Sequence, residues 1–162
     1  MVRVEPVTQA WADALVQGDD VFAMRFGVPV EANWAGFPEV IPFLGDAAQG
    51  SGPPEWGTHL VFDDDGALVG NGGWKGAPSE GVAEVGYAVA PARQGRGIAT
   101  AVVRVLVARA RAAGLRKVIA HTLAETSPST SVLLRCGFVK VDELVDVEDG
   151  PIWRWEISLL GD

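Results

Sequence analysis

The 162-residue chain has a single cysteine, Cys136, and no run of about 18 apolar residues that would span a membrane. One thiol cannot form an intrachain disulfide, and the cysteine-rich patterns of zinc sites are absent. The first residues, Met1–Pro6, lack the basic and apolar regions of a signal peptide. The sequence therefore predicts a cytoplasmic protein that holds no metal and does not associate with a membrane.

Basic residues are also scarce. The chain has 13 Lys and Arg against 21 Asp and Glu, which gives a formal net charge of −8 and a pI of about 4.7. Affinity for nucleic acid comes largely from Lys and Arg on phosphates, so no nucleic-acid partner is expected. An acidic protein attracts cationic substrates such as amines, although solubility alone is the simpler explanation of this charge.

Hydrophobic residues make up 48% of the chain, which predicts a substantial core and a single domain over residues 1–162. The predicted strands are Val2–Pro6, Thr58–Phe62, Ala67–Trp74, Gly81–Ala90, Lys117–Thr122, Val139–Val147 and Ile152–Leu159. The predicted helices are Gln9–Val16, Ile98–Ala113 and 128–136. This order indicates an α+β fold whose sheet is mostly antiparallel, with at least one parallel pair made by a strand–helix–strand crossover.

Capping residues set the expected ends of these helices. Thr8 is expected to cap the first helix, and Gly18 to end it. Gly114 is the expected C-cap of the second helix. Ser127 followed by Pro128 is typical of an N-cap and a first helical position, and it begins the third helix.

Two segments carry signals that are best explained by structure. Three aspartates and a glycine at 63–66 predict a hairpin turn with a solvated acidic tip, because the spaced ligands of a calcium loop are missing. Residues 21–56 combine irregularly spaced aromatics with Pro and Gly, which predicts short helices and loops around a pocket. We expect these aromatics to pack in the core rather than contact a ligand. They are Phe22, Phe26, Trp34, Phe37, Phe43 and Trp56.

The most informative segment, Glu84–Thr100, reads as a strand that runs into a glycine-rich turn and directly into a helix. Such a turn presents unpaired backbone N–H groups at the positive end of the helix dipole, which suits a phosphate group. Gly95 and Gly97 let the backbone approach an anion closely, and Arg96 between them adds a positive charge.

Three segments in sequence order resemble the GCN5-related N-acetyltransferase (GNAT) family. Gln94–Ala99 resembles its pyrophosphate-binding signature, Ala83–Val89 its central strand, and Ile119–Phe138 the ending Ser-x-x-Val-Leu-x-Lys-x-Gly-Phe. The resemblance is closest to the RimJ/RimL-like branch of ribosomal-protein alanine acetyltransferases and their small-molecule-modifying relatives. It covers about residues 81–138 well and the last two predicted strands more loosely.

The resemblance implies a fold, a reaction and a co-substrate. The GNAT-like fold has a twisted, mostly antiparallel sheet of about six or seven strands with one splayed parallel pair, flanked by about four helices. The implied reaction moves an acetyl group from acetyl-CoA to a primary amine, on a small molecule or a protein N-terminus, by direct attack in a ternary complex. Dimers are common in the family, so a homodimer is an open expectation.

The resemblance also implies which residues bind acetyl-CoA. The backbone N–H of Val89 would polarise the thioester carbonyl, and N–H groups of the glycine turn would hold the pyrophosphate. Family members often have Asn at 126 or 127, where this chain has Thr and Ser. The expected CoA-binding residues are Val89, Gln94, Gly95, Arg96, Gly97, Ile98, Ala99, Thr100, Thr126 and Ser127.

Transfer to an amine requires a base that removes a proton and an acid that returns one to the thiolate. Glu84 is the predicted base, because it occupies the acidic position of the central strand in the resemblance, and apolar neighbours are expected to raise its pKa. His121 is the alternative base. Ser129, which matches the serine of the RimL-like branch, and Tyr87 are the candidate acids.

Two other functions fit the same motifs. A non-catalytic regulator that binds acyl-CoA would need the same CoA-binding residues. A nucleotide-binding enzyme is the weaker alternative, because no Gly-Lys-Ser/Thr is present and Thr100 stands where a dinucleotide fingerprint has its third glycine. The acceptor amine is not specified by any of these motifs.

Overall fold

The computed structural model describes residues 2–44 and 53–160. The strands are β1 (Arg3–Pro6), β2 (Thr58–Phe62), β3 (Leu68–Trp74), β4 (Val82–Val89), β5 (Lys117–Leu123), β6 (Val139–Asp146) and β7 (Gly150–Ser158). The helices are α1 (Gln9–Gln17), α2 (Asp19–Phe26), α4 (Ile98–Ala112) and α5 (Pro128–Arg135). Short 3₁₀ helices span Pro38–Phe43, Pro54–Trp56 and Pro91–Arg93.

The strands form one seven-stranded sheet in the order β1-β2-β3-β4-β5-β7-β6. Every neighbouring pair is antiparallel except β4–β5, which is parallel because α4 crosses between them. The expected α+β fold, with a mostly antiparallel sheet and one parallel pair, is confirmed. None of the helices in the described residues is long and apolar enough to cross a bilayer.

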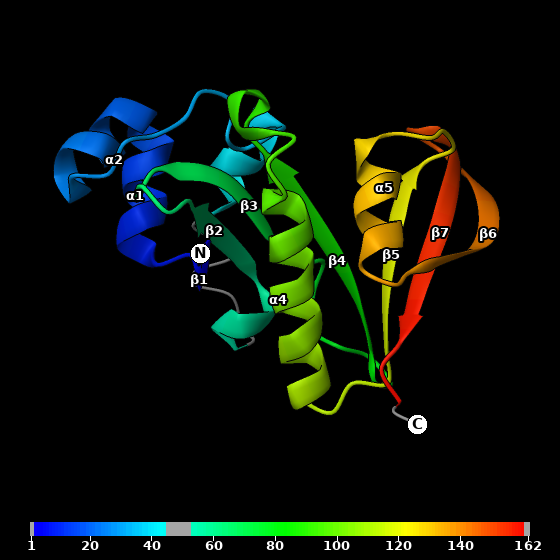
Figure 1. Cartoon of the computed structure of the whole chain (residues 1–162). Coiled ribbons are helices and arrows are strands. Elements are labelled where there is room, and N and C mark those ends of the chain that lie inside the picture. The colour runs from blue at the N-terminus through cyan, green and yellow to red at the C-terminus, as the bar shows by residue number, and fades with distance from the viewer. Residues whose placement is uncertain (1, 45–52, 161–162) are drawn as a thin grey trace.

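The parallel pair is joined at one end only. Its register begins at Val82↔Lys117 and stops at Glu84↔Ile119, although both strands continue beyond this point. Figure 1 shows β4 and β5 close together at this end and separating toward the other, with α4 on one side of the opening and α5 on the other. The sheet therefore opens between its two middle strands.

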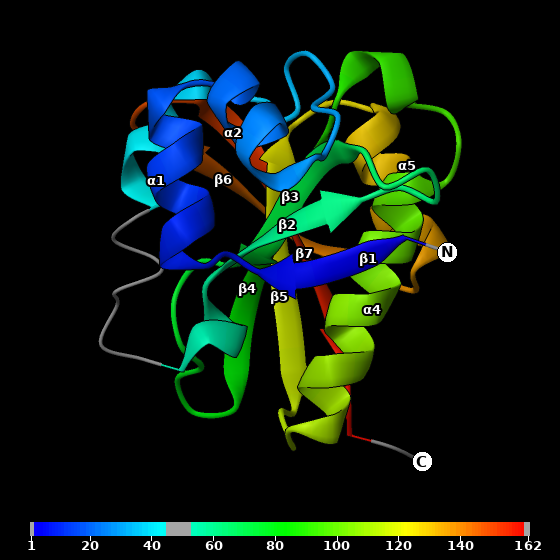
Figure 2. The same ribbon diagram turned by 90° about the vertical axis from the view of Figure 1, so that its left-hand side faces the viewer.

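Helices cover both faces of the sheet and create two clusters of buried hydrophobic side chains. One cluster packs α4 and α5 against β3, β4, β5 and β7. The other packs α1 and α2 against β2 and β3. Figure 2 shows α1 and α2 on one side of the sheet and α4 on the other.

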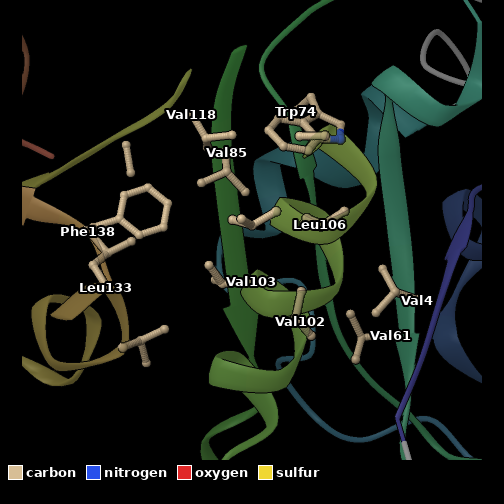
Figure 3. Packing of buried hydrophobic residues seen from close by; sticks show 14 of the residues in the cluster. Val4, Val61, Trp74, Val85, Val102, Val103, Leu106, Val118, Leu133 and Phe138 are labelled. Atoms are coloured by element: carbon tan, nitrogen blue, oxygen red, sulfur yellow. The ribbon is translucent and has the colours of Figure 1, made fainter. Parts of the chain in front are cut away.

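Helix α4 presents its apolar face to the sheet. Val102, Val103 and Leu106 are at most 1% exposed and point toward β3 and β4 (Figure 3). The helix lies close to β3 because Gly72 has no side chain. A Cβ there would come within 2.9 Å of the Val102 Cγ1. This close packing places the start of α4 next to the open end of β4.

The expected helix caps are largely confirmed. The Thr8 hydroxyl accepts a hydrogen bond from the N–H of Trp11 at 3.1 Å, and Ser127 forms a capping box with Thr130. The prediction that Gly114 caps α4 is wrong by one residue. Ala113 is the C-cap, and Gly114 follows it with φ +86°, a left-handed conformation that turns the chain toward β5.

The aspartate turn between β2 and β3 is confirmed as a turn, but its acidic tip is not simply solvated. Arg93 forms ion pairs with Asp63 at 2.9 Å, Asp65 at 3.0 Å and Glu31 at 2.8 Å. These hydrogen bonds raise the pKa of the Arg93 guanidinium further above its already high value. They tie the hairpin to the segment that leads into α4, a long-range contact that local spacing does not reveal.

A second histidine, His59 on β2, is fully buried. Its Nδ1 donates to the carbonyl of Gly57 at 3.0 Å, and its Nε2 has no hydrogen-bond partner in residues 2–44 and 53–160. Burial lowers the pKa of His59 below 6.5, and the charge of Arg109 acts in the same direction, against the Gly57 hydrogen bond and Glu55. The folded protein therefore holds a neutral imidazole here.

We expect this histidine to make stability depend on pH. Since the pKa of His59 is lower in the folded state, its contribution is fully present above pH 6.5 and is lost as the pH falls through the folded-state pKa. The free energy of unfolding should fall by up to about 1.4 kcal/mol per pH unit in that window. Urea unfolding of the wild type and of His59→Asn at pH 7.5 and 5.5 tests this. An equal change in the free energy of unfolding between the two pH values in both proteins would contradict it.

Candidate active site

The first cavity lies at the N-terminal end of α4 and has a volume of about 580 Å³. We call it the α4 cavity. It is bounded by the end of β4, the glycine turn, the first turn of α4 and one face of α5. Its lining includes eight of the ten expected CoA-binding residues, which are Val89, Gln94, Gly95, Gly97, Ile98, Ala99, Thr100 and Ser127.

The backbone at this cavity suits an anion. Gly97 is the N-cap of α4 with φ +81° and forms no side-chain cap, so the first N–H groups of a 15-residue helix are directed at the cavity end. Gly95 has φ +78°. A Cβ at either glycine would meet no atom within 4 Å, so the backbone conformation, not space, requires glycine here.

Arginines are placed differently from what the sequence suggested. Arg135, on α5, lines the α4 cavity, whereas Arg96 and Thr126 are not among its lining residues. The Arg93 side chain is occupied by its three carboxylate partners. Arg135 was not predicted from the sequence as a CoA-binding residue. The available signal was its helical spacing from Pro128, which places both residues on the face of α5 that lines the cavity.

The end of β4 presents backbone groups to the opening in the sheet. The N–H of Ala90 donates to the carbonyl of Val69 on the β3 side at 2.8 Å. Because bonding direction alternates along a strand, the N–H and carbonyl of Val89 face the side from which β5 has diverged. The Gln94 side chain donates to that Val89 carbonyl at 3.1 Å. This orientation is the one that the expected role of the Val89 N–H requires.

The second cavity, which we call the cleft cavity, has a volume of about 490 Å³ and lies in the gap between β4 and β5. Residues from β3, β4, β5, α5 and the segment 35–44 line it. Tyr87, Ala88 and Ser129 line both cavities. The two spaces therefore meet at these three residues.

Tyr87 and Ser129 form a hydrogen-bonded pair at this junction. The Tyr87 hydroxyl donates to the carbonyl oxygen of Ser129 at 3.1 Å and lies 3.1 Å from its hydroxyl oxygen. Burial raises the pKa of Tyr87 above 10.0, although the hydrogen bond with Ser129 opposes the shift. The phenol therefore keeps its proton at neutral pH.

Glu84, His121 and Lys75 form a second group beside the cleft cavity. One carboxylate oxygen of Glu84 lies 2.9 Å from the Nδ1 of His121 and 3.1 Å from the Nζ of Lys75. Burial raises the pKa of Glu84, but hydrogen bonds from His121 and Lys75 and their charges lower it by more, so the net shift is downward. The expectation that apolar neighbours raise this pKa is wrong, because both partners stabilise the carboxylate.

The ionised Glu84 decides the tautomer of His121. A carboxylate only accepts hydrogen bonds, so the Nδ1 of His121 must carry the proton in this contact. The Nε2 of a neutral His121 is then a hydrogen-bond acceptor. His121 and Lys75 line the cleft cavity, whereas Glu84 lies behind them and is not a lining residue. The base candidate that faces the cavity is therefore His121.

The aromatics of residues 21–56 divide between two roles. Phe22 and Trp34 are at most 1% exposed, as expected for core residues. Phe37 and Phe43 are 70% and 65% exposed and line the cleft cavity, so the core prediction is wrong for them. Phe37 is the N-cap and Phe43 the last residue of a short 3₁₀ helix, Pro38–Phe43, that buries none of its residues.

The segment before this 3₁₀ helix is held by Asn71 of β3. Its side-chain amide donates to the carbonyl oxygens of Ala35 at 3.0 Å and Trp34 at 3.4 Å. The cleft cavity is thus walled on one side by a segment that a single β3 side chain fixes to the sheet. No cluster of three or more His, Cys, Asp or Glu side chains suited to a metal occurs in the described part of the chain.

A family model described as "Acetyltransferase (GNAT) domain" matches residues 2–139. A search of curated proteins found no significant match.

Solved acetyltransferase structures share the fold at low sequence identity. The ribosomal-protein-S5-alanine acetyltransferase of Vibrio fischeri is 18% identical with a TM-score of 0.73, over 98% of this chain and 93% of that one. The microcin C7 self-immunity acetyltransferase MccE, in complex with acetyl-CoA and AMP, is 14% identical with a TM-score of 0.74, over 97% and 92%. The spermidine N-acetyltransferase of Vibrio cholerae, in complex with CoA and spermine, is 22% identical with a TM-score of 0.57, over 64% and 65%.

The glycine turn provides a test of the α4 cavity. Gly97→Ala forces a side chain into a left-handed conformation and displaces the N–H groups that face the cavity. We expect affinity for CoA, measured by calorimetry, to fall about tenfold. Gly114→Ala is the matched control, because Gly114 has φ +86°, open space around it and a place at the opposite end of α4. Equal losses of CoA affinity in both variants would contradict a phosphate site at Gly97.

Proposed function

The chain belongs to the GNAT acetyltransferase family, and from this premise we propose that it transfers the acetyl group of acetyl-CoA to a primary amine. The amine, on a small molecule or a protein N-terminus, attacks directly while both substrates are bound. We assign the protein to the RimJ/RimL-like branch, as one acetyltransferase domain over residues 1–162. The observation that carries the proposal is that the α4 and cleft cavities meet at Tyr87, Ala88 and Ser129.

The α4 cavity would bind acetyl-CoA, which supplies the acetyl thioester. The N-terminus of α4 and the turn at Gly95 and Gly97 hold the pyrophosphate. Arg135 adds positive charge from the cavity lining, and Arg96, which is not a lining residue, adds it from within the turn. The N–H of Val89 donates to the thioester carbonyl and stabilises the charge that develops there. The other residues proposed to contact CoA are Gln94, Ile98, Ala99, Thr100, Thr126 and Ser127.

His121 is proposed as the general base, and Glu84 as the residue that positions it. The support is geometric, since His121 faces the cleft cavity and its Nδ1–H is held by Glu84 at 2.9 Å. This contact leaves Nε2 to accept a proton from the substrate ammonium. The lowered pKa of Glu84 makes the carboxylate a weaker base but a constant partner for the imidazole.

Tyr87 is proposed as the general acid, with Ser129 holding its hydroxyl. The raised pKa of Tyr87 keeps the phenol protonated until it donates to the CoA thiolate.

In the full reaction one ammonium proton passes to His121 Nε2, the nitrogen bonds to the acetyl carbon, and the carbon–sulfur bond breaks. The second excess proton leaves to water, and both side chains return to their starting states by exchange with solvent. The products are the acetylated amine, CoA and one released proton.

Substitutions of His121 and Glu84 separate these two candidates for the general base. We expect His121→Ala to lower kcat about 100-fold and Glu84→Gln about tenfold, with acetyl-CoA affinity unchanged in both. Glu143→Gln, an exposed residue on β6, is the matched control. A larger loss in Glu84→Gln than in His121→Ala would make Glu84 the base.

The proposed acid predicts a second pH dependence. Because the pKa of Tyr87 is raised above 10.0, wild-type kcat should not fall between pH 8 and 9.5. Tyr87→Phe should lower kcat about tenfold or more without weakening acetyl-CoA binding, and Ser129→Ala should have a smaller effect. Steady-state kinetics with detection of free thiol measures both. Full turnover by Tyr87→Phe would remove Tyr87 from the mechanism, and binding of acetyl-CoA without any turnover of amines would favour a regulator.

A further inference from the structure

We infer that the acceptor is a small apolar α-amino acid or a close analogue, whose carboxylate is bound by Lys75 while its amine lies at His121. This inference rests on the proposed acetyl transfer and names the substrate class of that same site. It depends on which charged groups face the cleft cavity and on the side chains that surround them.

Lys75 provides the positive charge in the cleft cavity. Its side chain is 60% exposed, and its Nζ lies 3.1 Å from Glu84. An ammonium group has three donors, so this contact leaves donors for a substrate carboxylate. Lys75 lies along the sheet over Gly86, where an added Cβ would come within 3.5 Å of its Cε. The lysine stem therefore lies along the cavity wall, and its side chain stays largely exposed.

Lys75 and His121 share one partner beside the cleft cavity. Lys75 Nζ and His121 Nδ1 contact the same carboxylate oxygen of Glu84, at 3.1 and 2.9 Å, which places the two side chains side by side. The amine and the carboxylate of the substrate are also near neighbours, since one carbon separates them. One molecule can therefore place its amine at His121 and its carboxylate at Lys75, with charge-assisted hydrogen bonds to the lysine.

The rest of the cavity wall favours an apolar side chain on that amino acid. Phe37 and Phe43 expose their rings at the cavity, and Val40 lies between them on the 3₁₀ helix. Ala35 and Leu44 complete this wall. An apolar group placed against these side chains removes hydrophobic surface from water on both sides of the contact, which stabilises the complex.

The same lysine disfavours a polyamine. A second ammonium group close to the reacting amine would lie beside Lys75, and two ammonium groups only donate hydrogen bonds, so neither can satisfy the other. Lys75 and His121 are the ionisable basic residues among the described lining residues. The overall charge of −8 attracts amines to the molecule, but these two side chains select among them.

Four acceptors test the inference with the wild-type enzyme and saturating acetyl-CoA. They are leucine, leucinamide, 3-methylbutylamine and spermidine, and the readout is kcat/KM from release of free thiol. We expect leucine to exceed leucinamide and 3-methylbutylamine by about tenfold or more, because only leucine has a carboxylate for Lys75. We expect spermidine to be the poorest of the four.

Variants connect this preference to the lysine. Lys75→Met should reduce kcat/KM for leucine about tenfold or more relative to kcat/KM for 3-methylbutylamine, so that the preference disappears. Using the ratio of the two substrates removes any effect that reaches both through Glu84. Lys140→Met, on β6 against Trp153, removes the same charge outside the cavity and should keep the wild-type preference. Thermal unfolding of each variant establishes that it is folded.

The outcomes separate the inference from the proposed function. Preferential acetylation of spermidine, or equal rates for leucine and leucinamide, would overturn the inference and leave the acetyltransferase proposal intact. An unchanged preference in Lys75→Met would overturn the role of Lys75. If the protein binds acetyl-CoA but acetylates none of the four amines nor a peptide N-terminus, the proposed function itself fails.

Discussion

The structure depends on a parallel pair of strands that stays hydrogen-bonded at one end only. The β4–β5 register stops at Glu84↔Ile119, and beyond it the two strands belong to different packing units. β4 continues in the antiparallel ladder with β3, and β5 continues in the ladder with β7. Each strand keeps one satisfied edge, so the sheet can open without leaving whole strands unpaired. Both cavities exist because of this opening.

The opening also explains where the polar groups gather. Glu84 is the last β4 residue in register with β5, so its side chain and that of His121 on β5 meet where the strands begin to separate. Further along β4, the backbone of Val89 faces the gap that β5 no longer fills. Tyr87 lies between these two points and reaches Ser129 on α5. The end of the pairing thus places Glu84, Tyr87 and the outward-facing backbone of Val89 in order along β4.

Features fixed by neighbours in the chain were predictable from the sequence. The glycine turn at Gly95–Gly97 and the N-cap at Ser127 depend on residues a few positions apart, and both were predicted at the right residues. Features that depend on distant segments were not predictable in this way. Arg135 reaches the α4 cavity only through the packing of α5, and the lowered pKa of Glu84 needs His121 from β5 and Lys75 from the end of β3. Periodicity identifies a helix face but not what that face meets.

Net charge and local charge act over different distances, and this chain shows why they should be considered separately. A charge of −8 spread over the surface acts on an approaching molecule within about one Debye length, about 8 Å at physiological ionic strength. At the wall of the cleft cavity, Lys75 would act on a bound molecule at contact distance, where the Coulomb energy of a charge pair is largest. The surface raises the local concentration of amines of every kind, whereas discrimination requires an energy difference between bound molecules. Composition therefore predicts attraction of an amine, and only the cavity wall can specify its other substituents.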